Sequence, residues 1–218
     1  MKRIFISRQL QTDSPFRRRL EAAGYLVEGR SLIEFEAVPF EEVPKTDWIF
    51  FYSRRSVRYF FEGIDEIPES KWAVIGPGTK TTLREQGHRA DFTGTGDPEQ
   101  TAQNFLDVAR GRRVLFPRAR HSRRSVQQRL AGQIQAIDLI VYDNRPSAHV
   151  PEKTYDVLVF TSPMSVEAYC RQRNIRPNQR VIAIGRTTAK ALEQRGVNEI
   201  AVAATPSEES LAEVVMEE

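Results

Sequence analysis

Short apolar runs recur along the chain at regular spacing, and most of them are rich in β-branched or aromatic residues. A run that stays apolar at successive positions is typical of a strand covered on both faces. The pattern therefore predicts parallel strands buried between helices. The expected strands are Arg3–Ser7, Ser31–Phe35, Trp48–Tyr52, Trp72–Ile75, Ala90–Thr93, Arg113–Phe116, Ala136–Tyr142, Asp156–Thr161, Arg180–Ile184 and Glu199–Ala203.

Helix-start signals stand between most of these strands. The pairs Ser14-Pro15, Asp97-Pro98 and Thr205-Pro206 each place a capping side chain directly before a proline. Gln100 and Glu208 follow at the third helical position of the second and third helices, and Glu208 would complete a capping box. Strands that alternate with helices predict an α/β fold.

The second half of the chain repeats the first at an offset of 109 residues. Asp47–Phe61 aligns with Asp156–Cys170, and Ala73–Gly87 aligns with Ile182–Gly196 without a gap. Ten of these thirty positions are identical, where ordinary residue frequencies would give about two. We therefore expect two similar α/β lobes with parallel sheets. A cleft between two lobes is a preferred place for a ligand.

Composition agrees with this organisation. The 218 residues suit one large or two small domains, and 40% hydrophobic with 28% charged residues is typical of a globular protein. No apolar run approaches the ~18 residues of a membrane span, and the first residues show no secretory pattern. One cysteine and three scattered histidines predict neither a disulfide nor a zinc cluster. We expect a cytoplasmic protein without a metal site.

Arginine dominates the cations, with 26 of the 32 basic residues. Eight arginines lie within Arg110–Arg129, and no Asp or Glu occurs from residue 108 to 137. Arginine matches the geometry of carboxylate and phosphate groups. The run is open to three interpretations: a solvated helix face, a nucleic-acid patch, or a site for a polyanionic small molecule.

Ser53 and Ser162 each end an apolar strand and precede a helix, and Pro163 follows the second. Both serines fit the role of helix N-cap. The first turn of a helix also leaves backbone N–H groups free, and these bind anions. Capping and anion binding are compatible interpretations of the same two positions.

Thr79 and Thr188 are the repeat-related pair in a second loop motif, each after a strand and a glycine. Residues 76–78 partly match a nucleotide-binding loop but fit neither of the two standard glycine fingerprints. The threonines could cap helices. They could also contact a ligand, because α/β proteins bind ligands at the carboxyl ends of parallel strands.

Three further residues carry side chains with possible chemistry. Tyr142 ends a strand, where a tyrosine is usually a packing residue with a solvated hydroxyl. His121 has no acidic partner at triad-like spacing, so no catalysis is assigned to it. Cys170 lies on an amphipathic segment and is expected to pack as a small apolar residue.

Several segments together resemble one family. FTSPMSVEAY, VIAIGRTTAKALEQRG and TPSEESLAEVV look like the C-terminal half of uroporphyrinogen-III synthases. The segments DWIFFYSRRSV and AVIGPGTKTTLREQG and the strand-end Tyr142 fit the same family in the right order. The resemblance covers nearly the whole chain.

The resemblance implies two Rossmann- or flavodoxin-like lobes joined by two linker strands, with the ligand cleft between the lobes. It also implies an interleaved chain. The first lobe would comprise residues 1–32 and 150–218, and the second residues 38–138. The linkers would be residues 33–37 and 139–149.

The implied reaction needs no cofactor. Hydroxymethylbilane, a linear tetrapyrrole with eight carboxylates, loses its hydroxyl as water, and its last ring is inverted as the macrocycle closes to uroporphyrinogen III. The chemistry needs an acid that helps the hydroxyl leave and a site that holds a cationic azafulvene. It also needs positioning that favours attack at the substituted carbon over simple closure. The family further implies a monomer, with possible hand-over of substrate from hydroxymethylbilane synthase and no membrane or nucleic-acid partner.

Site residues carry over from the resemblance one by one. Tyr142 matches the family's strand-end tyrosine and would be the proton donor. Thr79 matches the threonine of the first glycine loop, and Thr187 and Thr188 match the paired threonines of the second. Backbone amides would contribute near Ser53, Ser162, Gly76 and Gly185.

The chain departs from the family at Tyr52, where many relatives have threonine, and at Arg54-Arg55. Two other functions remain open from the residues. One is a non-catalytic two-lobed regulatory protein that binds a tetrapyrrole or another polyanion. The other is a nucleic-acid binder that uses Arg110–Arg129, although this run contains no recognisable binding motif.

Overall fold

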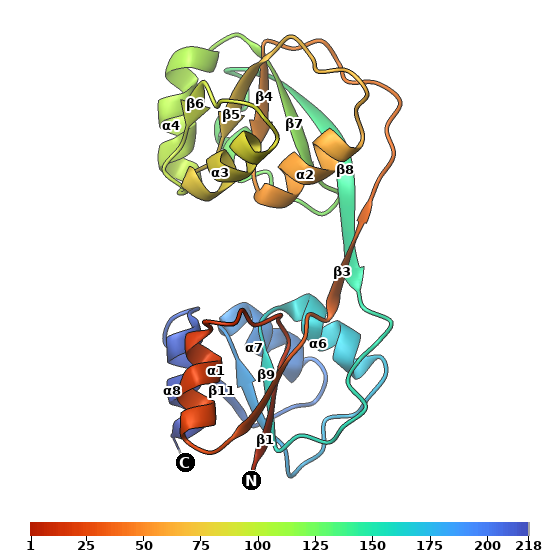
Figure 1. Ribbon diagram of the computed structural model, residues 1–218, viewed down its shortest axis with the longest axis vertical. Coiled ribbons are helices and arrows are strands. Elements are labelled where there is room, and N and C mark those ends of the chain that lie inside the picture. Colours follow the sequence, from red (N-terminus) through yellow and green to blue (C-terminus); the bar gives the residue numbers. More distant parts are fainter. Residues whose placement is uncertain (218) are drawn as a thin grey trace. The chain divides into compact units, whose positions relative to one another are not determined.

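The computed structural model describes residues 1–217 and divides into two compact units. One unit combines residues 1–34 with the chain from residue 145 onward, and we call it the discontinuous lobe. The other, residues 35–144, is the inserted lobe. The colours of Figure 1 show both ends of the chain in the discontinuous lobe. No helix among the described residues is long and apolar enough to cross a membrane.

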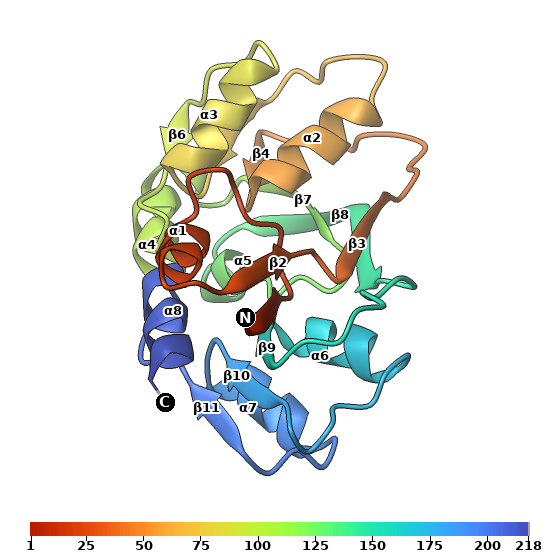
Figure 2. The ribbon, with the colours of Figure 1, turned by 60° about the horizontal axis from the view of Figure 1, so that its bottom comes forward.

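The discontinuous lobe contains a five-stranded parallel sheet in the order β11-β10-β9-β1-β2. Its strands are β1 (Arg3–Ile6), β2 (Leu26–Gly29), β9 (Val157–Phe160), β10 (Arg180–Ala183) and β11 (Ile200–Val202). Two helices pack side by side on one face of this sheet (Figure 1, Figure 2): α1 (Pro15–Ala22) and α8 (Glu208–Met216). The other face is covered by α6 (Pro163–Cys170) and α7 (Arg186–Glu193).

The inserted lobe contains a six-stranded sheet in the order β3-β8-β7-β4-β5-β6. Its strands are β3 (Ile33–Ala37), β4 (Trp48–Phe51), β5 (Lys71–Val74), β6 (Phe92–Thr93), β7 (Arg113–Ala119) and β8 (Gln135–Pro146). On one face lie α2 (Arg54–Glu62) and α3 (Pro77–Glu85), and on the other α4 (Pro98–Ala109) and α5 (Ser125–Arg129). The strands from β8 to β6 pair in parallel.

The two sheets confirm the internal repeat. The order β11-β10-β9-β1-β2 in one lobe corresponds to β6-β5-β4-β7-β8 in the other, and β3 is an additional edge strand. Helices α6 and α7 correspond in the same way to α2 and α3, which cover the matching sheet face. The predicted α/β fold of two similar lobes with parallel sheets is therefore confirmed.

Two elements differ from the sequence prediction. Strand β2 was not expected; it lies at the sheet edge with only β1 beside it, and none of its residues is fully buried. Helix α8 begins after Ser207, not after Thr205. The Ser207 Oγ accepts a hydrogen bond from the Ser210 N–H at 3.1 Å, so the serine replaces the threonine as N-cap.

Candidate active site

A pocket of about 220 Å³ lies in the inserted lobe beside the ends of β4, β7 and β8. We call it the tyrosine pocket. It brings together two residues predicted from the sequence, Ser53 and Tyr142. Its lining residues are Phe35, Tyr52, Ser53, Ser56, Arg118, Ala119, His121, Ser122, Tyr142 and Asn144.

Tyr142 is half-buried on β8, and aromatic contacts fix its ring. The ring stacks on Tyr59 of α2, with 5.1 Å between centroids and 19° between planes. Phe35 of β3 lies on the ring at 6.3 Å. Within residues 1–217 the phenol hydroxyl forms no hydrogen bond with the protein. The tyrosine therefore offers a positioned O–H group in the pocket.

Ser53 caps α2. Its Oγ accepts a hydrogen bond from the Ser56 N–H at 3.1 Å, and the Ser56 Oγ accepts one from the Ser53 N–H at 3.1 Å. Ser162 caps α6 in the same manner, with its Oγ accepting from the Ser165 N–H at 3.1 Å. The capping role inferred for both serines is confirmed, and it orients the first turn of each helix toward the carboxyl edge of its sheet.

Gly76 and Gly185 occupy the N-cap positions of α3 and α7, and neither helix has a side-chain cap. A Cβ at Gly76 would lie 3.0 Å from the Gly96 Cα, so a side chain there would push the neighbouring backbone aside, and glycine fits this close approach. Because no side chain caps these helices, their first-turn amides remain suited to an anionic ligand.

Thr79 and Thr188 are therefore not the caps of their helices. Both lie at the third helical position, with their N–H groups 3.1 Å and 3.0 Å from the carbonyl oxygens of Gly76 and Gly185, and both are buried. Thr187, one residue before, is exposed. The capping interpretation of the two threonines was wrong.

Arg54 contacts both helix-start loops of the inserted lobe, the one before α2 and the one before α3. A Cβ built on Gly78 would lie 2.9 Å from the Arg54 Nη2, which places the guanidinium against the first turn of α3. Arg54 itself is the first residue of α2. A cation thus lies where two helix N-termini meet, and such a place favours a carboxylate. The sequence had marked Arg54 only as a departure from the family.

A partly buried ion pair supports the wall of the tyrosine pocket. The guanidinium of Arg118 on β7 binds Asp138 of β8 through two hydrogen bonds, Nε to Oδ1 at 2.7 Å and Nη2 to Oδ2 at 2.9 Å. The Nη1 donates to the carbonyl oxygens of Ala119 and Arg120 at 2.8 and 3.0 Å. Arg118 therefore fixes the chain that leaves β7 and lines the pocket.

The network continues to Tyr52. The Gln127 Nε2 donates to the Asp138 Oδ1 at 2.8 Å, and the Gln127 N–H donates to the Tyr52 hydroxyl at 3.0 Å. Burial raises the pKa of Asp138, but the hydrogen bonds from Arg118 and Gln127 outweigh it and hold that pKa below its usual value. Burial raises the pKa of Tyr52, so its hydroxyl stays protonated. Tyr52 is thus a structural member of the pocket.

The arginine run does not form one helix face. Arg118 is buried, and Arg112, Arg120, Arg124 and Arg129 pair with carboxylates elsewhere in the lobe. These pairs reduce the charge that a nucleic-acid backbone could use, so the structure does not favour the nucleic-acid interpretation.

His121 has an acidic neighbour that the sequence did not reveal. Its Nε2 lies 4.0 Å from the Asp143 Oδ1, which is longer than a hydrogen bond. The other carboxylate oxygen of Asp143 accepts a hydrogen bond from the Arg120 Nε at 2.9 Å. The histidine lines the tyrosine pocket without belonging to a triad.

In the discontinuous lobe, the remaining predicted residues lie at the ends of two adjacent strands. Ser162 follows β9, and Gly185, Thr187 and Thr188 follow β10. Within residues 1–217 no group of three or more His, Cys, Asp or Glu side chains is arranged to hold a metal ion.

Comparison with known proteins identifies the family. The family model described as uroporphyrinogen-III synthase HemD matches residues 14–213. A uroporphyrinogen-III synthase of Chlorobaculum parvum is 27% identical over 90% of this chain and 91% of its own length. The crystal structure of uroporphyrinogen-III synthetase from Helicobacter pylori has a TM-score of 0.72 at 22% identity, covering 99% of both chains. A mutant uroporphyrinogen III synthase from Thermus thermophilus has a TM-score of 0.53 at 19% identity, covering 99% of this chain and 98% of that one. The chain therefore belongs to the uroporphyrinogen-III synthase family.

Proposed function

We propose that this protein converts hydroxymethylbilane to uroporphyrinogen III as a cyclising lyase that releases water and uses no cofactor. Membership of the family supports the reaction. The observation that carries the catalytic assignment is the tyrosine pocket, where an O–H group with no hydrogen-bond partner among residues 1–217 is held beside the N-terminus of α2.

Tyr142 is the proposed proton donor. Its O–H would give a proton to the departing hydroxyl of the substrate, so that water leaves and the terminal pyrrole becomes a cationic azafulvene. The substituted carbon of the last ring then attacks the methylene carbon of this cation and forms a spiro intermediate. The bond from the substituted carbon to its original methylene bridge breaks, which inverts the ring and leaves a second azafulvene cation. The free α-carbon of the inverted ring closes onto this cation and loses its proton, and this proton would restore the Tyr142 phenol. The stacked Tyr59 holds the donor in one orientation. General acid catalysis of this kind contributes about 10²–10⁴-fold.

Positioning is the second task, because closure without inversion competes. We propose that substrate carboxylates bind the uncapped N-termini of α3 and α7, with Arg54 adding a positive charge at the first of these. Thr79, Thr187 and Thr188 would contact carboxylates or pyrrole nitrogens from the same turns. Amides that follow Ser53 and Ser162 would add further donors.

We also propose that the protein acts in the cytoplasm as a monomer that receives its substrate from hydroxymethylbilane synthase. The substrate closes spontaneously to the type I isomer, so rapid transfer would limit that loss. Sedimentation of the two proteins, alone and mixed, tests the monomer and the association that transfer requires. A stable dimer of this chain would contradict the monomer.

Isomer analysis tests the reaction itself. Freshly prepared hydroxymethylbilane is incubated with the protein, and the products are oxidised and separated into types I and III. We expect type III to dominate with the protein and type I to dominate without it or after heat inactivation. Activity should survive dialysis against a chelator. If type I alone forms although the protein binds the substrate, the protein is a binding protein and the enzymatic proposal fails.

A further inference from the structure

A second, larger groove lies on the discontinuous lobe, at the amino ends of β10 and β11. Its volume is about 620 Å³, and residues 170, 173–177, 179, 181 and 195–199 line it. Helix α6 runs from Ser162 at the other edge of the sheet to Cys170 at this groove. Eight helical residues span about 12 Å, so the groove is separate from the loops proposed to hold the substrate. We call it the arginine groove.

The charge of the groove is unbalanced. Arg173, Arg176 and Arg195 line it, and Glu199 is the one carboxylate among its lining residues. None of the three arginines forms an ion pair with a carboxylate within residues 1–217. Arg171, which lies just before the groove, does pair with Glu167.

The three arginines lie close to the C-terminal end of α6. Burial raises the pKa of the Tyr169 phenol and of the Cys170 thiol; the charges of Arg173 and Arg176 oppose this rise at Tyr169, and the charge of Arg195 opposes it at Cys170. Tyr169 and Cys170 are adjacent at the end of α6. The cations therefore converge on one end of one helix.

Cations at a helix C-terminus also stabilise the helix dipole, and this would explain the arginines without any ligand. The internal repeat argues against that explanation. The corresponding positions of the inserted lobe, 109 residues earlier, hold Ile64, Ile67 and Gln86. Helix α2 has no basic residue in its last turn, and α3 has only Arg84 there, so the fold does not require cations at these three positions.

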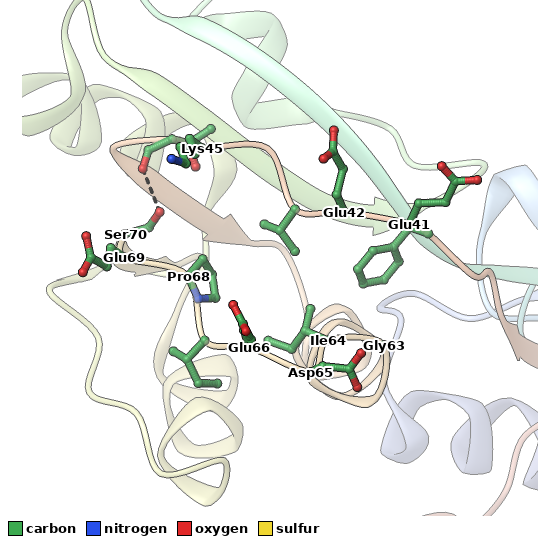
Figure 3. Close-up of a pocket in the computed structure, with 14 residues that line it drawn as sticks. Glu41, Glu42, Lys45, Gly63, Ile64, Asp65, Glu66, Pro68, Glu69 and Ser70 are labelled. Carbon is green, nitrogen blue, oxygen red and sulfur yellow. Dashed lines mark hydrogen bonds between the residues drawn. The ribbon is translucent and has the colours of Figure 1, made fainter.

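The repeat-related loop of the inserted lobe even has the opposite charge. Gly63–Ser70 lines a groove of about 820 Å³ (Figure 3), and its acidic side chains are Asp65, Glu66 and Glu69. In the arginine groove, the C-terminal ends of two helices carry roughly half a negative charge each, and Glu199 adds one more. The positive charge of the three arginines exceeds this total. The excess is a property of this groove and not of the repeat.

We propose that the arginine groove binds a compact polyanion, a small molecule with two or more phosphate or carboxylate groups. Several arginine forks suit such groups better than a single cation does. The volume lies within the roughly 300–1,000 Å³ of small-molecule sites. The amide side chains of Asn174 and Asn198 also line the groove and can donate hydrogen bonds. This binding does not depend on the proposed reaction.

Cys170 provides a reporter, because it is the single cysteine of the chain and lines the groove. Alkylation by iodoacetamide is measured at mildly alkaline pH, since burial raises the pKa of this thiol. The probes are inorganic pyrophosphate and citrate, each compared with sodium chloride at the same ionic strength. We expect saturating pyrophosphate or citrate to slow alkylation at least about tenfold relative to the salt control. The two probes distinguish a phosphate ligand from a carboxylate ligand.

Matched variants test the arginines. The double variant Arg173→Gln/Arg176→Gln should need at least about tenfold more pyrophosphate for the same protection, as expected for the loss of charge-assisted hydrogen bonds. Arg171→Gln should behave like the unmodified protein. Unchanged far-ultraviolet circular dichroism and unchanged urea unfolding in all variants would show that the fold is intact.

Four outcomes would overturn the proposal. These are no protection by either probe, equal protection by sodium chloride, equal protection in the double variant, and protection by a glutamate decapeptide but by neither small anion. The last outcome would assign the groove to an acidic protein segment.

Discussion

The partly buried pair Arg118–Asp138 gives a prediction that can be worked from the structure. Arg118→Met keeps a side chain of similar length but removes the guanidinium. Four hydrogen bonds are lost, two to Asp138 and two to the carbonyl oxygens of Ala119 and Arg120. Asp138 keeps the hydrogen bond from Gln127 at 2.8 Å.

The loss of stability in each variant depends on the hydrogen bonds and neighbouring charges that the remaining partner keeps. Removing one member of a buried ion pair costs about 3–5 kcal/mol. The Asp138 side chain is 29% exposed and Arg124 lies 3.4 Å from its Oδ2, so we expect Arg118→Met to cost about 3 kcal/mol, the lower limit. The Arg118 side chain is only 7% exposed, so Asp138→Leu should cost more, about 4–5 kcal/mol.

The double variant Arg118→Met/Asp138→Leu separates pairing from packing. It leaves no unpaired buried charge, and replacing a whole buried pair by apolar groups is often neutral. We expect the double variant to lose at least about 2 kcal/mol less than the sum of its two single variants, measured as a double-mutant cycle.

Urea unfolding followed by tryptophan fluorescence is the assay. Both tryptophans, Trp48 and Trp72, are buried in the inserted lobe, so their emission reports on that lobe alone. Arg112→Met is the matched control, because its guanidinium is 3.9 Å from Asp47 and its side chain is 62% exposed. Exposed pairs contribute about 0–1 kcal/mol.

The pH dependence has a defined sign. The pKa of Asp138 is lower in the folded protein than its usual value, so the stabilisation is fully present above the unfolded pKa of about 3.9. It disappears as the pH falls through the lower folded pKa. The stability difference between the unmodified protein and Arg118→Met should therefore stay constant from neutral pH to about pH 5 and shrink only below about pH 4. Two results would refute the reasoning. One is that Arg118→Met loses no more stability at neutral pH than Arg112→Met does. The other is that the stability losses of the two single variants add up to that of the double variant.

Three further predictions concern the proposed site and the other lobe. Tyr142→Phe should lower turnover by about 10²-fold with unchanged tryptophan-monitored unfolding; wild-type turnover and product ratio would remove the tyrosine from the mechanism. Thr79→Ala and Thr188→Ala should raise the Michaelis constant several-fold and lower the free energy of unfolding by about 1 kcal/mol. The loss of stability should stay this small because glycines, and not these threonines, cap the helices. An unchanged Michaelis constant would count against substrate contact. Ser14→Ala removes the N-cap of α1 and a hydrogen bond to Glu208 at 2.5 Å, and should destabilise the discontinuous lobe by about 1–2 kcal/mol; far-ultraviolet circular dichroism measures this, since that lobe has no tryptophan.

The strands and the repeat could be predicted because they depend on local pattern. Runs such as Trp48–Phe51 and Val157–Phe160 are apolar at every position, and their repeat-related spacing made the two-lobed α/β fold the natural interpretation. Strand β2 escaped because only one neighbour supports it and its residues are half-exposed. Edge strands of this kind lack the continuous apolar signal.

The contacts of the site could be predicted only in part. The serine caps follow from strand–helix boundaries, which the sequence marks. The partnership of Arg118 with Asp138 depends on the register of β7 against β8, in which Phe116 lies opposite Asp138. Nothing in the arginine run distinguishes Arg118 from its neighbours. Thr205 and Ser207 both satisfy the rules for an N-cap, and only the packed helix selects Ser207.

The insertion of one lobe into the other has a consequence for synthesis on the ribosome. Strand β1 lies between β9 and β2, and Ile4, Phe5 and Ile6 are fully buried there. Its partner β9 begins at Val157, so at about 5–20 residues per second the ribosome needs roughly 10–30 s to supply it. The whole inserted lobe emerges during that interval. We therefore expect residues 35–144 to complete their sheet before the sheet of the discontinuous lobe can form, while β1 waits with one edge unpaired. Chaperones that bind such edges would meet β1 rather than the strands of the inserted lobe.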